Sequence, residues 1–306
     1  MSFLKKILFA PLFLISFTLL IFNLNNVFSS YDFIFSLSLE TLISLITISV
    51  LLMLSGVFFA LFISLCQELM FILPVISLAA IIPLFIIKPP LGMVMIIGSL
   101  ITLLITYFSI NEALKKYLTF NPKAIFNPSI KLMAQLLLLT ISLSYFLSIN
   151  QVIAKNGFQI PDSLLDSALQ LTDQFVEKDT SEEPTPKLSI TKEQIAALRQ
   201  NPEALRQSGL DPKILDSLDQ PITQEEDLTK ALTKQLVKSQ FEQTLKPYLN
   251  IIPIALAVLL FITLMSLNSL VGIFTAPLLS IIFLGLEKSG FVKFTTEQRP
   301  VKKMVI

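Results

Sequence analysis

Long apolar runs and one extended polar segment alternate along the 306-residue chain. Six stretches contain no Asp, Glu, Lys or Arg: 7–31, 41–67, 69–87, 89–111, 132–154 and 247–286. A helix that crosses a bilayer needs about 20 mainly apolar residues, because the hydrocarbon core is about 30 Å thick and each residue adds about 1.5 Å. Each stretch has room for one such helix, and the last has room for two. The pattern predicts an all-α, polytopic membrane bundle with six or seven spans.

The breaks between the apolar runs predict where the chain turns. We expect spans at 7–24, 42–66, 69–87, 91–110, 132–149, 249–267 and 270–286. Asn268 and Ser269 separate the last two spans, which are therefore predicted to form a hairpin. Asn121-Pro122 and Asn127-Pro128 are both predicted to form turns in the lysine-containing loop before residue 132.

Two prolines, Pro74 and Pro83, lie within the third apolar run. Each proline removes a backbone hydrogen bond that lipid cannot replace. We therefore expect this run to be kinked or to cross the membrane only partly.

Residues 151–247 follow a different pattern, in which polar and apolar residues alternate with the spacing of amphipathic helices. Residues 178–188 are rich in acidic residues and proline and are predicted to be a flexible linker. The chain is thus divided into a five-segment transmembrane region at 1–150, a soluble, mostly helical insert at 151–247, a transmembrane hairpin at 248–286 and a basic tail at 287–306.

Charge separates these parts further. Residues 151–247 contain 11 basic and 16 acidic residues, a net charge of −5, whereas the remainder contains 12 basic and 6 acidic residues, a net charge of +6. The acidic insert is the surface that we expect to meet a protein partner, and the cationic part borders the lipid bilayer. No long basic block is present in the sequence, which argues against a nucleic-acid partner.

The composition also restricts the chemistry. The chain has no His and one Cys, Cys66, which excludes His-containing zinc sites, His-ligated haem and Ser–His or Cys–His nucleophile pairs. We predict no metal site, no cofactor and no catalytic residue. No charge lies in the middle of an apolar run, which argues against a carrier built around a buried carboxylate. A membrane enzyme would be left with carboxylates, Lys, Tyr and Ser/Thr as catalysts, so we favour a non-enzymatic protein.

Small and hydroxyl-bearing residues recur at the spacing of one helix face in three of the apolar runs. The three sets are Gly56, Ala60 and Ser64; Ser99, Thr102 and Thr106; and Thr140, Ser144 and Ser148. Such faces are typical of close helix packing within membranes. The alternative interpretation is a polar pathway or a substrate groove. We favour packing and treat these residues as candidate helix-packing faces.

The leading functional hypothesis is a multi-pass protein of the cell membrane that anchors the helical insert and presents it to a partner. The alternative is a permease or channel component for a small or lipid-like substrate. Lys and Arg in short loops favour the cytoplasm, but seven spans would place six of these residues on each side. This tie indicates that one run does not cross. The uncharged stretch 25–31 and the basic loop before residue 132 favour an extracytoplasmic insert.

Overall fold

The computed structural model describes residues 8–29, 34, 38–117, 120–158 and 246–292. This part of the chain contains α-helices, one short 3₁₀ helix at Lys246–Tyr248 and no strand, so the predicted all-helical fold is confirmed. The α-helices are α2 (Phe9–Ser29), α4 (Leu39–Cys66), α5 (Leu69–Ile86), α6 (Leu91–Lys116), α7 (Pro122–Asn156), α13 (Ile252–Gly272) and α14 (Thr275–Lys288). The linker 178–188 and residues 159–245 of the predicted insert lie outside the described residues.

The chain divides into two compact units. The first consists of Met1–Ser29, Leu39–Ser148 and Ala257–Ile306, and the second of Ser30–Ser38 and Ile149–Leu256. The helical bundle belongs to the first unit, and α7 and α13 each contribute residues to both units.

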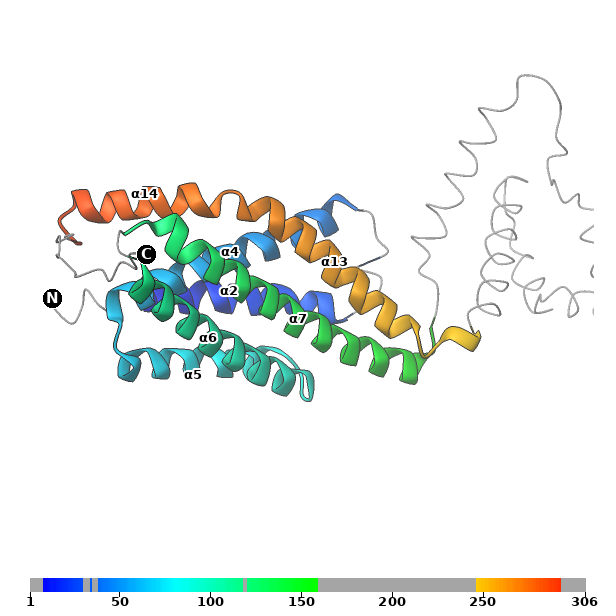
Figure 1. Ribbon diagram of the computed structural model, residues 1–306. Coiled ribbons are helices and arrows are strands. Elements are labelled where there is room, and N and C mark those ends of the chain that lie inside the picture. The colour runs from blue at the N-terminus through cyan, green and yellow to red at the C-terminus, as the bar shows by residue number, and fades with distance from the viewer. Residues whose placement is uncertain (1–7, 30–33, 35–37, 118–119, 159–245, 293–306) are drawn as a thin grey trace, which may run out of the picture. The chain divides into compact units, whose positions relative to one another are not determined.

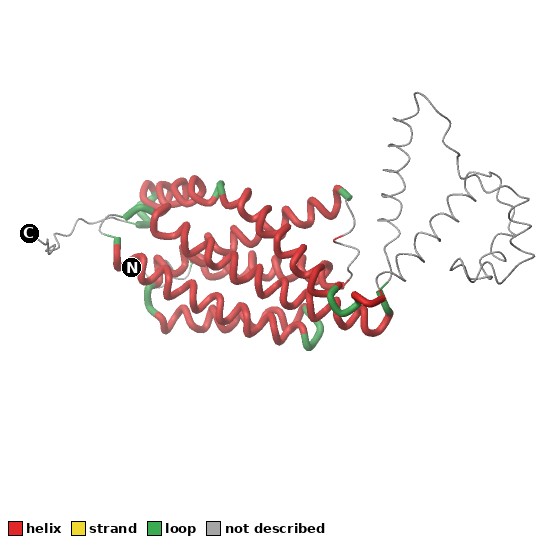
Figure 2. The backbone as a smooth tube through the Cα atoms, turned by 45° about the vertical axis from the view of Figure 1, so that its right-hand side comes forward, coloured by secondary structure: helices red, strands yellow, loops and turns green. Residues whose placement is uncertain are grey.

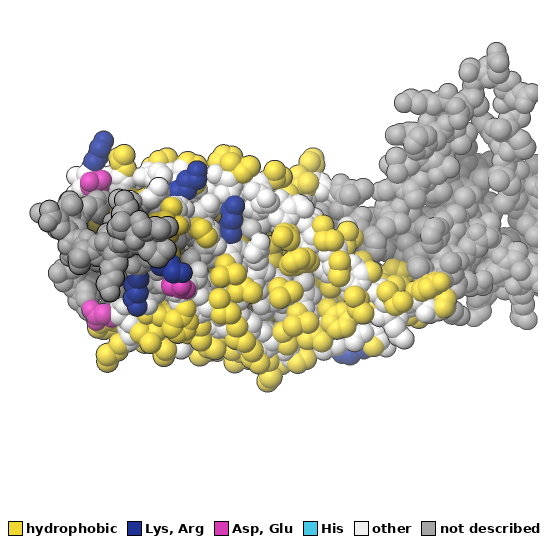
Figure 3. Space-filling model, viewed as in Figure 1, with side chains coloured by type: hydrophobic (Ala, Val, Ile, Leu, Met, Phe, Trp, Pro, Cys, Tyr) yellow, Lys and Arg dark blue, Asp and Glu magenta, His cyan; other side chains and the backbone are white. Residues whose placement is uncertain are grey.

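Six helices in the described residues are long and apolar enough to cross a membrane, namely α2, α4, α5, α6, α13 and Pro122–Lys155 of α7. The outer surface of the bundle agrees with a lipid environment, because large apolar side chains such as Phe22 and Phe85 are 63% and 83% exposed. Figure 3 shows apolar side chains spread over the visible face of the bundle. The chain is therefore a multi-pass membrane protein.

Helix α5 contains both Pro74 and Pro83, yet it runs without interruption over 18 residues. Its length of about 27 Å, at about 1.5 Å per residue, is close to the thickness of the hydrocarbon core. Helix α5 is therefore long and apolar enough to cross the membrane. Close to its end, the carbonyl of Pro83 accepts a hydrogen bond from the backbone N–H of Ile87 at 2.8 Å.

The predicted hairpin at Asn268 and Ser269 is wrong, because both residues lie within α13. The helix instead breaks at residues 273–274, four residues before Pro277. A proline has no N–H for the carbonyl four residues earlier, here that of Ile273, and its ring collides with that carbonyl. Phe274 keeps right-handed helical angles, with φ −78° and ψ −13°. Helix α14 consequently continues toward the same end of the bundle as α13, as Figure 1 shows in gold to red.

The predicted turn at Asn127 and Pro128 is also wrong, because α7 already begins at Pro122. The side-chain oxygen of Asn121 accepts a hydrogen bond from the backbone N–H of Ala124 at 3.3 Å. Asn is a favoured residue at the N-cap, and proline is favoured at the first helical position that follows it. The pair Asn121-Pro122 therefore starts the helix ten residues before the predicted span.

Within the bundle, α2 packs against α4 and α5, and α6 packs against the same two helices. The core contains aromatic side chains, including Phe13 of α2 and Phe59 of α4, whose ring centroids lie 4.8 Å apart. Helix direction alternates through the bundle: α2, α5 and α7 run one way, and α4, α6 and the pair α13 and α14 run the other way (Figures 1 and 2).

This alternation gives the bundle two distinct ends. One end carries the start of α2, the 66–69 connection, the start of α7 and the end of α14. We call it the lysine-rich end, because its described residues include Lys115, Lys116, Lys123, Lys131 and Lys288. The opposite end carries the end of α2, the start of α4 and the 86–91 connection.

Candidate functional site

The residues of the three predicted faces lie in the interior of the bundle, with one exception. Gly56, Ala60, Ser99, Thr102, Thr106, Thr140, Ser144 and Ser148 are buried, whereas Ser64 is half-buried. The Ser64 hydroxyl donates a hydrogen bond to the Leu61 carbonyl of its own helix at 2.8 Å.

On the α4 face, Gly56 lies against α7. A Cβ atom at this position would approach Cγ2 of Ile130 to 2.9 Å. Glycine thus allows α4 and α7 to come closer than any larger residue would permit. Ala60 lies one turn further along α4 and is fully buried.

On the α6 face, the hydroxyls bond mainly to their own helix. Ser99 donates to the Met95 carbonyl at 2.6 Å, and Thr106 donates to the Thr102 carbonyl at 2.8 Å. These bonds satisfy the hydroxyl donors without a partner on another helix. The face is therefore less polar than its composition indicates.

The close approach of α6 to α7 depends on Gly98, a residue that the sequence analysis missed. A Cβ atom on Gly98 would lie 2.5 Å from Oγ1 of Thr140 and 2.9 Å from its Cβ. Gly98, Thr102 and Thr106 are spaced by four residues, so the pattern was present in the sequence. Ser99, Thr102 and Thr106, which follow a three-then-four spacing, had been taken as the face instead.

On the α7 face, Ser148 connects two helices. Its hydroxyl donates a hydrogen bond to the Phe28 carbonyl in the last turn of α2, at 2.6 Å. Carbonyls in the last turn of a helix have no partner within the helix, so Ser148 satisfies a group that would otherwise need another donor. Ser144 is 0% exposed, and its hydroxyl has no hydrogen-bond partner among the described residues.

Two further hydroxyl pairs join helices and were not foreseen. Ser55 of α4 donates to the Ser16 hydroxyl of α2 at 3.2 Å. The hydroxyls of Ser109 on α6 and Ser129 on α7 lie 2.8 Å apart. Single serines carry no signal of their partner in the sequence, because the partner depends on helix rotation.

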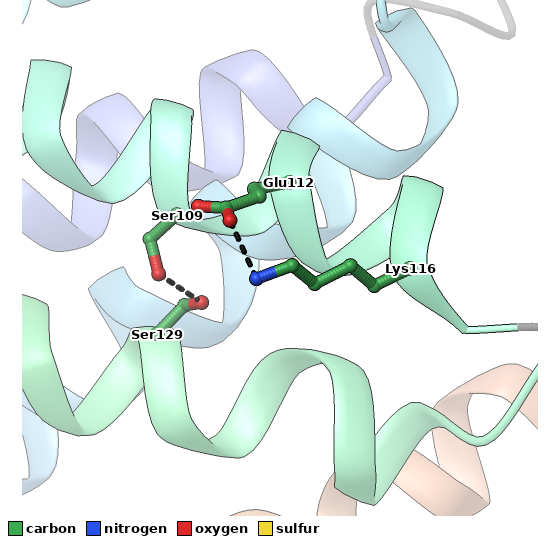
Figure 4. Close-up of polar contacts among 4 residues, drawn as sticks. All are labelled: Ser109, Glu112, Lys116 and Ser129. Atoms are coloured by element: carbon green, nitrogen blue, oxygen red, sulfur yellow. Dashed lines mark hydrogen bonds and ion pairs between the residues drawn. The ribbon is translucent and has the colours of Figure 1, made fainter.

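The Ser109–Ser129 pair lies beside an ion pair toward the lysine-rich end (Figure 4). The Lys116 ammonium and the Glu112 carboxylate, one turn apart on α6, are separated by 2.6 Å. Both side chains are well exposed, and an exposed pair at this helical spacing contributes little to stability, about 0.3–0.5 kcal/mol.

Basic side chains gather at the lysine-rich end, as Figure 3 shows in dark blue. The acidic residues described there are Glu68, Glu112 and Glu287. In the part of the chain that the structure describes, Lys115, Lys123, Lys131 and Lys288 form no ion pair with a carboxylate. This end therefore presents unpaired positive charge.

Within the described ranges, no group of three or more His, Cys, Asp or Glu side chains is placed to hold a metal ion. Cys66 is buried and is the one cysteine of the chain. Comparisons with protein-family models, curated proteins and solved structures give no match to this chain.

Proposed function

We propose that this protein is a membrane anchor, in which a six-crossing bundle holds residues 151–247 outside the cytoplasm and presents them to a protein partner. The break at 273–274 is the observation that supports this proposal most directly. Because α14 continues the path of α13, the pair accounts for one crossing, and the chain before α2 and the chain after α14 then meet the same side of the membrane.

The distribution of charge supports this orientation. With the long segment 151–247 left out, the sequence places eleven basic residues on the side of the lysine-rich end and one on the opposite side. The eleven are Lys5, Lys6, Lys115, Lys116, Lys123, Lys131, Lys288, Lys293, Arg299, Lys302 and Lys303, and the one is Lys88. An excess of Lys and Arg in short loops is typical of the cytoplasmic side. The tie predicted for seven spans then disappears, and this distribution supports an insert outside the cytoplasm.

The interior of the bundle supports anchoring over transport. At Gly56 and at Gly98, α7 approaches its neighbours so closely that a single added carbon atom would collide. Ser99, Thr106 and Thr140 donate their hydroxyls to carbonyls of their own helices. Closely packed helices with internally bonded hydroxyls are the arrangement expected of a structural bundle.

Cysteine labelling tests the orientation. Cys66 is the one cysteine of the chain, so Cys66→Ala provides a cysteine-free background. Into this background we would introduce either Ser181→Cys, in the predicted linker, or Ser289→Cys, directly after α14. A membrane-impermeant maleimide applied to intact cells should label the first variant and not the second. The second should be labelled only after the membrane is opened.

The reverse labelling pattern would show that the bundle has the opposite orientation. Labelling of both variants, or of neither, in intact cells would place the two positions on the same side of the membrane. An even number of crossings would then separate them, which would contradict the single crossing by α13 and α14. Expression and membrane insertion of each variant are checked by labelling in detergent, where both introduced thiols should react.

A further inference from the structure

One exposed face of α7 changes from cationic to apolar along its length. Lys131, Gln135, Leu139 and Leu143 are spaced by four residues and are all exposed. Residues at this spacing are neighbours on a helix surface, and each lies about 40° around the helix from the one before it. Leu139 and Leu143 are 57% and 52% exposed and continue the stripe away from the lysine-rich end.

A second lysine extends the cationic part of this stripe. Lys123 lies eight residues before Lys131, about 12 Å away along the axis and about 80° around the helix. Lys123 is also exposed. Nearby on α6, the Glu112 carboxylate is already engaged by Lys116 at 2.6 Å. In the described part of the chain, no carboxylate neutralises Lys123 or Lys131.

We propose that this stripe of α7 binds an anionic phospholipid, with the headgroup phosphate between Lys123 and Lys131 and an acyl chain along Leu139 and Leu143. An ammonium group is a strong donor to phosphate oxygens. The apolar stem of a lysine lets its charge reach the headgroup region while the stem covers apolar surface. The order of lysine, amide and leucine along the helix follows the order of phosphate, glycerol and acyl chain along the lipid.

The proposal depends on the membrane location of the bundle and not on its orientation. A failure of the labelling experiment above would therefore leave it standing, and its own failure would leave the anchor function standing.

Native mass spectrometry of the purified full chain provides the test. Phosphatidylglycerol and phosphatidylcholine with the same acyl chains would be titrated separately, and apparent Kd values compared. The wild type should bind phosphatidylglycerol more tightly. The double variant Lys123→Gln/Lys131→Gln should weaken its binding by about thirtyfold, given about 1 kcal/mol for each lysine near an anionic surface.

Two matched controls separate a site from a general effect of charge. Lys88→Gln/Lys155→Gln removes the same charge elsewhere and should leave phosphatidylglycerol binding unchanged. Lys123→Arg/Lys131→Arg keeps the charge at the site and should retain most of the affinity. Binding by the wild type should also weaken as KCl is raised, a measurement that needs no variant.

Equal affinity of the wild type for the two lipids would overturn the proposal. So would an equal loss in the Lys88 and Lys155 control, or insensitivity to KCl. The last measurement is competition with inorganic phosphate. If millimolar phosphate fully displaces phosphatidylglycerol, the lysines bind a free anion and the leucine part of the stripe has no role, which would also overturn the proposal.

Discussion

Gly98 of α6 and Thr140 of α7 occupy opposing positions at the closest approach of these two helices, where a Cβ atom on Gly98 would lie 2.5 Å from Oγ1 of Thr140. The contact makes the absence of a side chain at residue 98 a requirement of the bundle. Gly98→Ala should therefore push the helices apart and lower the free energy of unfolding by about 1–3 kcal/mol, as for other overpacked sites.

The measurement is thermal or denaturant unfolding in detergent. Gly285→Ala is the matched control, because Gly285 also lies within a helix but has nothing within 4 Å of the position of a Cβ atom. Alanine is the better helix former by about 1 kcal/mol, so this variant should be equally stable or more stable. A Gly98→Ala protein as stable as the wild type would contradict the close packing of α6 and α7.

Ser148→Ala should destabilise the bundle by removing the donor to the Phe28 carbonyl. The expected loss is about 0.5–2 kcal/mol, the range for one hydrogen bond between membrane helices. Ser266→Ala is the control, because that exposed hydroxyl bonds to the Ile262 carbonyl of its own helix. Both variants would be compared by unfolding in the same detergent, and equal losses would mean that the contact between α7 and α2 does not matter.

Phe283→Ala tests whether α14 is held against α7. Phe283 is buried, and its ring stacks on that of Phe126 with centroids 5.4 Å apart and an interplanar angle of 3°. It also meets the Phe120 ring edge-on at 5.0 Å. Truncation of a buried Phe costs about 3–5 kcal/mol in soluble cores, and we expect a clear fall in melting temperature. Phe274→Ala, at a position 65% exposed, should change it little. A similar effect of the two variants would show that α14 is not packed as described.

Removal of metal ions should have no effect on stability. Without His, and with a single Cys, the chain has few ligands suited to transition metals. The melting temperature would be measured with and without EDTA. A fall in EDTA that zinc reverses would reveal a site that neither the sequence nor the described residues indicate.

Limited proteolysis should cut the chain first within residues 178–188. Their acidic and proline-rich composition is typical of segments that do not bury apolar surface. The cleavage sites would be mapped by mass spectrometry after brief digestion. Initial cleavage within 224–245, with the linker intact, would refute the predicted division of the insert.

The sequence predicted the existence of the helices well, because a run of about 20 uncharged apolar residues has few alternatives in a membrane protein. It predicted helix ends poorly where the helix continues beyond the apolar run. Asn121 and Pro122 begin α7 within polar sequence, and hydropathy carries no information about such a start. The capping preferences of these two residues would have been the better guide.

The hairpin error has a different physical origin. Asn268 and Ser269 are polar but remain helical, because backbone hydrogen bonds in an apolar region are costly to give up. Pro277 breaks the helix because it cannot form one of those bonds at all. The decisive residue, Pro277, therefore lies eight positions beyond Ser269, the second residue of the polar pair that was taken to mark the turn.

The sequence predicted which residues belong to the candidate site better than it predicted their contacts. Buried positions such as Ser99 and Ser148 follow from the spacing of one helix face. The partners do not follow, because the Ser148 donor meets a carbonyl 120 residues away in the sequence. Helix rotation and the order of helices around the bundle decide such contacts, and neither is encoded in a local pattern.

The contacts of α7 also bear on the order of assembly. Helices of a membrane protein enter the bilayer first and associate afterwards, and the N-terminal part of a chain is made first. Helix α7 contacts α2 through Ser148, α4 through Ile130 and α6 through Thr140. Until α7 is synthesised, the glycine surfaces of α4 and α6 have no occupant, so the first four helices form an incomplete intermediate. Release of the chain before residue 122 should leave that intermediate open to degradation, and the fifth helix is the step that commits the bundle to its final fold.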